Sequence, residues 1–165
     1  MNSIPQLLEN VRLGGEEAVD ASRTLGLILE RERVRRPVGD DGGLSIILDD
    51  HWSTRRLNDQ ELQGIVDDLI EYVRSTERPS AMAVWALTKS YEPRIVPPLI
   101  NLLYGVMEDH ACEHLAYQAL IGIINSGPGS ENDGDARAAI RDASERGRGE
   151  VQETARDYLM AVDRG

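Results

Sequence analysis

The sequence predicts an all-α protein: a short right-handed superhelix of about four helical hairpins, with an insertion after the first. Two recurring pairs of residues lead to this prediction. Each hairpin begins with two apolar residues four positions apart: Ile4–Leu8, Ile65–Leu69, Ile95–Leu99 and Ala136–Ile140. Each continues, 17 to 21 residues later, with an alanine four positions before a leucine: Ala21–Leu25, Ala83–Leu87, Ala116–Leu120 and Ala155–Leu159.

A spacing of four residues places both members of a pair on one face of a helix. The first helix of each hairpin then presents a mostly bulky apolar face, and the alanine of the second allows a neighbouring helix to come close. A single hairpin cannot bury such faces by itself. We therefore expect the hairpins to stack in chain order, as one domain spanning residues 1–165.

The composition also favours helix-on-helix packing. The chain is 41% hydrophobic and contains no Phe, so small and branched aliphatic residues supply the core. It has no run of 18 apolar residues, and no membrane span is expected. The first five residues lack the basic start and apolar run of a signal peptide. With Cys112 as the only cysteine, a cytoplasmic location is expected.

The charge is strongly acidic, with 29 acidic and 18 basic residues and a net charge of −11. Nucleic-acid binding requires a cationic surface that replaces the phosphate counterions, so nucleic acid is not expected as a partner. An acidic surface attracts basic partners and favours solubility. The same acidity is common among soluble bacterial proteins without such partners. Arginine supplies all the basic residues except Lys89, which is typical of a high-GC bacterial genome.

The first hairpin is expected over residues 4–13 and 16–35. Its first helix follows Ser3-x-x-Gln6, a capping box in which each side chain bonds the backbone of the other residue. A pair of glycines separates the two helices. Pro37 ends the second helix, because proline cannot continue one.

An insertion is expected over residues 37–57. The first two alanine–leucine pairs are 62 positions apart, whereas the later ones are 33 and 39 apart, and repeats of this class have a period of roughly 33 to 47 residues. Within the insertion, residues 44–48 favour a strand, and Asp49, Asp50 and Trp52 follow. Insertions in stacked repeats lie on one face, which is often the binding face.

The later hairpins are expected to follow one another directly. A second capping box, Asn58-x-x-Glu61, restarts the helical pattern. Helices are expected over residues 59–74, 79–90, 94–106, 110–125, 135–146 and 150–162. The last hairpin, residues 135–162, is more polar than the others, as a capping repeat with one side toward solvent must be.

The third hairpin, with IVPPLINLL at 95–103 and AYQAL at 116–120, resembles the HEAT family of α-solenoid repeats. The resemblance extends over residues 59–162 and, more weakly, over residues 3–30. The Asp and Arg that are usual in that family at the turn and inner helix do not recur regularly here, and the insertion interrupts the stack. The resemblance implies the binding of proteins or peptides, although some members of the family are enzymes.

One motif suggests an enzyme instead. His110-x-x-Glu113-His114 matches the inverted zinc-protease signature, in which two histidines share a zinc ion and the glutamate acts as a general base. The alternative function is a small metal-dependent hydrolase or a HEAT-like lyase-type enzyme that uses the region of His110 and His114, although the helical phase of Cys112 points that residue toward the core. That protease family requires a sheet and a further glutamate ligand, for which this chain offers no convincing context. We therefore expect both histidines at the surface, with no metal and no cofactor.

The helical phase of Trp85 points to a binding surface. Trp85 follows the core residue Ala83 by two positions, or about 200° around the helix, so it faces away from the core. Alternatively, Trp85 packs against Trp52 or residues 44–48 of the insertion. Equivalent positions in the other hairpins form a ridge with it. The residues expected to bind a partner are Arg23, Asp49, Asp50, Trp52, Trp85, Lys89, His114 and Gln118.

Together these features predict a non-enzymatic module that binds a protein or peptide, and a basic one because of the negative charge. An inhibitor or immunity-type protein for a cationic bacterial toxin is one member of this class. Asp67, Asp68 and Glu71 place three negative charges within little more than one helical turn. This cluster either attracts a basic partner or forms a solvated helix face.

Overall fold

The computed structural model describes residues 3–33, 52 and 55–165. Within these residues the chain forms eight α-helices and two short 3-10 helices, and no strand is present. The prediction of an all-α protein is confirmed for this part of the chain. The strand expected at residues 44–48 lies outside the described residues.

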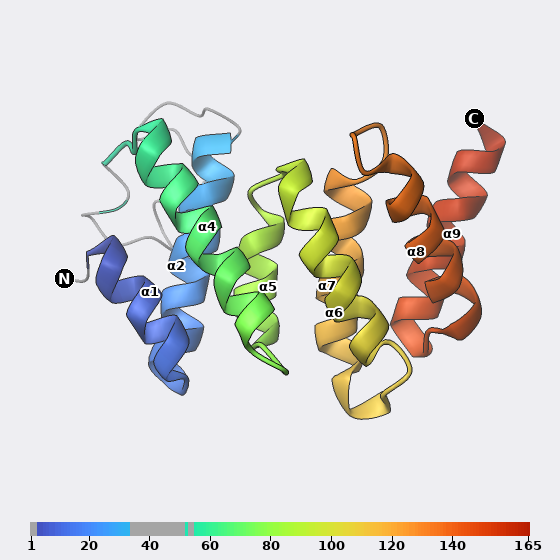
Figure 1. Cartoon of the computed structure of the whole chain (residues 1–165), viewed down its shortest axis with the longest axis horizontal. Coiled ribbons are helices and arrows are strands. Elements are labelled where there is room, and N and C mark those ends of the chain that lie inside the picture. Colours follow the sequence, from blue (N-terminus) through green and yellow to red (C-terminus); the bar gives the residue numbers. More distant parts are fainter. Residues whose placement is uncertain (1–2, 34–51, 53–54) are drawn as a thin grey trace.

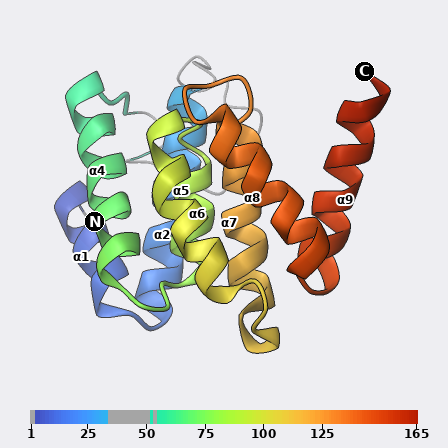
Figure 2. The ribbon, with the colours of Figure 1, turned by 45° about the vertical axis from the view of Figure 1, so that its right-hand side comes forward.

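The helices form two layers (Figures 1 and 2). We call the layers outer and inner, and each helix packs on its hairpin partner and on the next helix of its own layer. The outer layer contains α1 (Ile4–Leu13), α4 (Asp59–Ser75), α6 (Val96–Val106) and α8 (Asp133–Arg146). The inner layer contains α2 (Glu16–Arg33), α5 (Ala81–Thr88), α7 (Glu113–Ser126) and α9 (Gly149–Arg164).

Both predicted capping boxes are present. The backbone N–H of Gln6 donates to Ser3 Oγ over 3.4 Å, and that of Ser3 donates to Gln6 Oε1 over 2.8 Å. At the start of α4, the N–H of Glu61 donates to Asn58 Oδ1 over 2.8 Å, and that of Asn58 donates to Glu61 Oε1 over 3.2 Å. Each box satisfies backbone donors that have no partner inside the helix.

Two inner helices begin differently from the prediction. Helix α5 is shorter than residues 79–90, because Ser80 is its N-cap and accepts a hydrogen bond from the N–H of Ala83 over 3.1 Å. In front of α7, the Asp109 side chain accepts from the N–H of Ala111 over 2.9 Å. This contact accompanies a 3-10 turn, η3 (His110–Cys112), so the α-helix itself begins three residues later than predicted.

The alanine–leucine pairs form the core between the layers, as predicted. The side chains of Ala83, Ala116 and Leu120 are fully buried. Leu159 is only partly buried, because no further helix packs on the far side of α9 in the described chain. The core therefore thins at this end, which agrees with the more polar sequence of the last hairpin.

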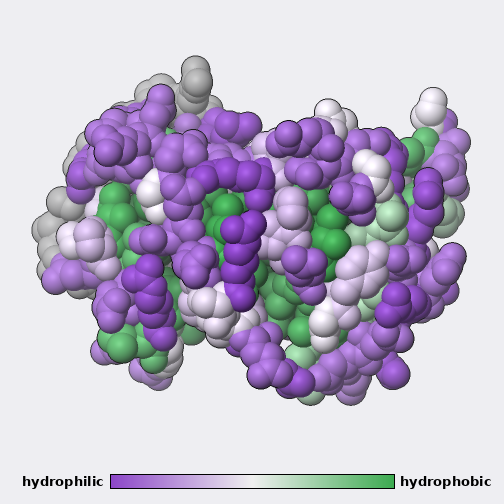
Figure 3. Space-filling model, in the orientation of Figure 1, coloured by the Kyte–Doolittle hydropathy of each residue, from purple (hydrophilic) through white to green (hydrophobic). Residues whose placement is uncertain are grey.

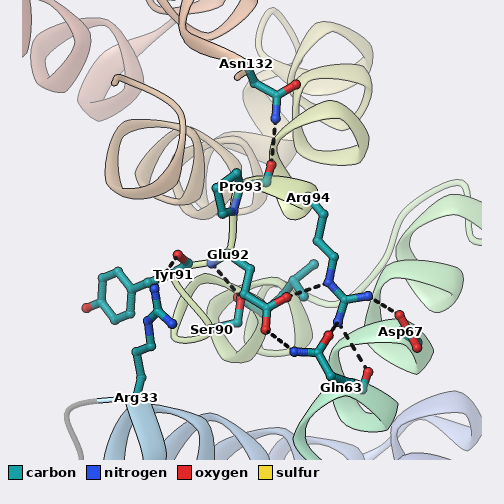
Figure 4. Close-up of polar contacts among 10 residues, drawn as sticks. Arg33, Gln63, Asp67, Ser90, Tyr91, Glu92, Pro93, Arg94 and Asn132 are labelled. Carbon is teal, nitrogen blue, oxygen red and sulfur yellow. Dashed lines mark hydrogen bonds and ion pairs between the residues drawn. The ribbon is translucent and has the colours of Figure 1, made fainter. Parts of the chain in front are cut away.

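The turn between α5 and α6 connects several helices through polar contacts (Figure 4). This turn contains η2 (Pro93–Ile95). The Arg94 guanidinium donates to the carboxylate of Asp67 and to Gln63 Oε1, the latter over 2.6 Å, both on α4. From the loop before α8, the Asn132 side chain donates to the Pro93 carbonyl oxygen over 2.9 Å. The outer layer is thus linked by hydrogen bonds as well as by apolar packing.

Candidate binding surface on the inner layer

The predicted ridge residues of the described chain come from three neighbouring inner helices. We call their solvent-facing side the inner face, and define it by Arg23, Trp85, Lys89, His114 and Gln118. Arg23 and His114 are exposed, whereas the other three side chains are half-buried. Because α2, α5 and α7 pack side by side, these residues lie on one layer of the molecule.

Trp85 lies against α2, and a glycine makes this contact possible. A Cβ atom on Gly26 would lie 2.4 Å from Trp85 Cζ3 and 3.1 Å from the Cα of Ala86. No side chain fits at position 26 while the indole keeps this position. The prediction that Trp85 faces away from the core is therefore only half right, because one part of the ring packs on the core and the rest remains exposed.

Lys89 also restrains the indole. Its Nζ atom lies 5.2 Å from the centroid of the Trp85 ring, within the range of a cation–π interaction. The same Nζ lies 3.6 Å from Glu30 Oε1 on α2. Together, Gly26, Lys89 and Glu30 hold the ring in one orientation. A half-exposed tryptophan with a fixed ring loses little conformational entropy on binding.

The insertion residues differ from the expectation. Asp49 and Asp50 lie outside the described residues. Trp52 is 1% exposed, so it is a core residue and not the surface contact that we predicted. Its backbone carbonyl accepts a hydrogen bond from Arg31, which is fully buried and also donates to the Arg55 carbonyl over 2.5 Å.

Sequence reasoning missed the role of Arg31. This residue stands in the charged run Arg31-Glu32-Arg33, which is indistinguishable in sequence from a solvated helix end. In the structure, Arg31 Nη2 lies 2.8 Å from Glu32 Oε1, and the Glu32 side chain is only 7% exposed. The buried cation is thus paired and hydrogen-bonded, as a buried charge must be. Only the fold reveals which arginine of the run is buried.

The residues of the metal motif have separate roles. Glu113 Oε1 accepts a hydrogen bond from the backbone N–H of Glu150 over 3.0 Å, and so caps the start of α9. The His110 side chain is 84% exposed, and His114 is also exposed, as predicted. Among the described residues, no three or more His, Cys, Asp or Glu side chains are placed to hold a metal ion.

Cys112, in the 3-10 turn before α7, faces the core. It is 6% exposed, and its Sγ atom lies 3.6 Å from Asp109 Oδ2. Burial raises the pKa of the thiol, because a thiolate is poorly solvated in the core. A reactive cysteine needs the opposite surroundings, exposed and electropositive. The environment of this residue therefore offers no support for nucleophilic chemistry.

The acidic side chains of the two layers differ in their partners. On α4, Asp67 pairs with Arg94, and Asp68 lies 3.5 Å from Arg12. Among the exposed carboxylates of α9, Glu150, Glu153 and Asp157 have no ion pair with any described residue. Their spacing of three and four residues places them on one side of the helix. Negative charge is therefore available beside α7.

In the described part of the chain, no helix is both long enough and apolar enough to span a membrane. Comparison of the chain with protein-family models, with curated proteins and with solved structures gave no match.

Proposed function

We propose that this protein is a non-enzymatic binding module, a short HEAT-like solenoid that holds a basic protein or peptide on its inner face. One observation carries the proposal: the Trp85 indole is half-exposed at the centre of the inner layer and is held there by Gly26 and Lys89. Tryptophan is enriched among the residues that dominate binding energy at protein interfaces. A ring that is already oriented makes an effective anchor.

The charge supports a basic partner. The chain has a net charge of −11, and α9 contributes carboxylates with no described ion pair on its exposed side. Such a field attracts a cationic partner and increases the rate of association. A basic segment that contacts Trp85 and extends toward α9 would cross the exposed side of α7 at His114 and Gln118. An inhibitor or immunity-type protein for a cationic bacterial toxin is a specific form of this proposal.

The proposal can be tested by measuring the binding of this protein to an array of basic peptides. The control is a second array of the same peptides, in which each basic residue is replaced by glutamate. Trp52→Phe leaves Trp85 as the only tryptophan, so its fluorescence reports binding at the inner face directly. We expect the basic peptides that bind to change this fluorescence. Trp85→Ala should weaken their binding by about 2 kcal/mol, the effect of losing an interface anchor.

Leu13→Ala is the matched control, since Leu13 is 73% exposed at the end of α1 and away from the inner layer. It should leave peptide binding unchanged. Equal binding of the basic and acidic arrays, or binding that survives Trp85→Ala in a folded protein, would refute the proposal.

A further inference from the structure

A hollow on the outer layer lies between α1 and α4, on the opposite layer from Trp85. It has a volume of about 450 Å³, and its apolar lining consists of the exposed Pro5, the half-buried Ile4 and the buried Leu8 and Ile65. In Figure 3, the view from the outer layer is mostly hydrophilic, and apolar side chains appear in the hollows between helices, including those over α1 and α4. The hollow is within the size range of protein sites that accept a ligand group.

Gly64, in the middle of α4, lies in this hollow without an evident structural reason. A Cβ atom at this position would meet no heavy atom within 4 Å. Glycine inside a helix costs stability relative to alanine, because it leaves more backbone freedom to be lost on folding. No internal contact compensates for this cost here. The missing side chain instead leaves the hollow open to an incoming group.

The edge of the hollow is negatively charged. Arg12 is shared by Asp68, at 3.5 Å, and Glu9, at 3.6 Å. Arg94 is likewise shared by Asp67 and Glu92. Glu61, the third carboxylate that lines the hollow, pairs with Arg55 over 2.5 Å. The ion pairs around the hollow thus join five carboxylates to three arginines, and the surroundings are net negative.

We infer that this hollow is a second docking site, for a basic segment of a partner protein that inserts an apolar side chain beside Gly64. The apolar walls would bury the inserted side chain, and lysine or arginine residues flanking it would face the acidic edge. The site goes beyond the proposed function, because it uses the outer layer and needs no contact with Trp85.

A short synthetic peptide of leucine and lysine residues at helical spacing is the probe, and a peptide with glutamate in place of lysine is its control. Backbone amide chemical shifts of the labelled protein locate the contact. We expect the lysine peptide to shift the resonances of Gly64 and Ile65, and its affinity to fall as salt is added. The glutamate peptide should not bind.

Gly64→Leu tests the hollow itself. A Cβ atom at position 64 meets no heavy atom within 4 Å, so the variant should fold. Its side chain should lower the affinity for the probe by about tenfold, because it occupies space that the peptide uses. Gly105→Leu is the matched control. Gly105 is also a helical glycine of the outer layer with no atom within 4 Å of a built Cβ, but its cleft is lined by Arg74 and Arg78.

A basic peptide is also expected to bind the inner face, so Trp85→Ala separates the two sites: it should leave the shifts that the probe causes at Gly64 and Ile65 unchanged. Four results would overturn the inference: unchanged affinity at these resonances in Gly64→Leu, an equal loss in Gly105→Leu, loss of the Gly64 and Ile65 shifts in Trp85→Ala, or equal binding of the glutamate peptide. The inference would also be overturned if the protein is a dimer in solution and Gly64→Leu makes it a monomer. The hollow would then be occupied by a second copy of the chain.

Discussion

Two helical glycines, Gly26 on α2 and Gly64 on α4, have opposite surroundings. The space beside Gly26 is filled by the Trp85 ring, whereas the space beside Gly64 is empty. The first glycine is explained by packing within the molecule, and the second is not. The comparison shows that a helical glycine makes close packing possible on the inner layer, and that the same residue on the outer layer borders open space.

A substitution at a fully buried position should have the largest effect on the free energy of unfolding. It gives the upper limit against which the two glycine substitutions can be compared. Ala116 on α7 is fully buried between helices. Ala116→Leu should overpack this contact and lower the free energy of unfolding by about 1–3 kcal/mol, toward the upper end of that range because several atoms are added. Chemical denaturation measures the change. A variant as stable as the parent would show that the contact around Ala116 can expand.

Gly26→Ala adds one methyl group where the indole already lies. We expect it to lower the free energy of unfolding by about 1–2 kcal/mol, because Trp85 must move while the Ala86 backbone cannot. Replacing Trp85 as well should remove most of this penalty. A double-mutant cycle with Trp85→Ala measures the coupling between the two positions. If the two effects simply add, Trp85 is not what requires glycine at position 26.

Gly64→Ala is expected to have the opposite sign. With no atom near the new methyl group, the variant should raise the free energy of unfolding by about 0.5–1 kcal/mol, which is the ordinary preference for alanine inside a helix. Denaturation of Gly64→Ala beside Gly26→Ala makes the comparison direct. Destabilisation by Gly64→Ala would mean that the hollow is closed in solution.

The smallest expected effect on stability comes from a polar contact of the outer layer, and it depends on pH. The Tyr104 hydroxyl on α6 donates to the Asp142 carboxylate on α8, and this hydrogen bond raises the pKa of Tyr104. A raised pKa in the folded chain means that the neutral phenol is stabilised by folding. This contribution is complete below the pKa of a free phenol, about 10, and is lost as the pH rises through the folded pKa.

Denaturation at a series of alkaline pH values should therefore show a fall in stability that is smaller in Tyr104→Phe. The destabilisation by Gly26→Ala should stay constant over the same range, because that contact is apolar. If the free energy of unfolding has the same pH dependence in Tyr104→Phe and in the parent, the hydrogen bond from Tyr104 to Asp142 does not contribute to stability.

Much of the helical framework was predictable because its signals are local. The capping boxes at Ser3 and Asn58 set the starts of α1 and α4 through residues three apart, and both are present. The four-residue spacing identified the buried faces of α5 and α7. The error at the start of α5 arises because Pro79 and Ser80 both suit a helix start. The error before α7 arises because the Asp109 cap is followed by a 3-10 turn and not directly by the α-helix.

The site was less predictable because its members are distant in sequence. The helical phase of Trp85 indicated that its side chain points outward. A helical wheel considers one helix at a time, so it cannot show that the indole packs against Gly26 of a neighbouring helix. Trp52 had the pattern of an exposed insertion residue and is buried. The unpaired carboxylates of α9 are recognisable only in the structure, because Arg156, which lies among them in sequence, donates instead to the Ser144 carbonyl oxygen over 3.1 Å.

The sequence by itself thus determined the helices, their order and the faces that pack, because hydrophobic spacing and capping act over a few residues. The tertiary structure alone decided which charged and aromatic residues are buried. Arg31 is a core residue because Trp52 and Arg55 bring their carbonyl oxygens to it, and Trp85 is half-buried because Gly26 leaves space for its ring. Such outcomes depend on contacts between elements, which no local pattern encodes.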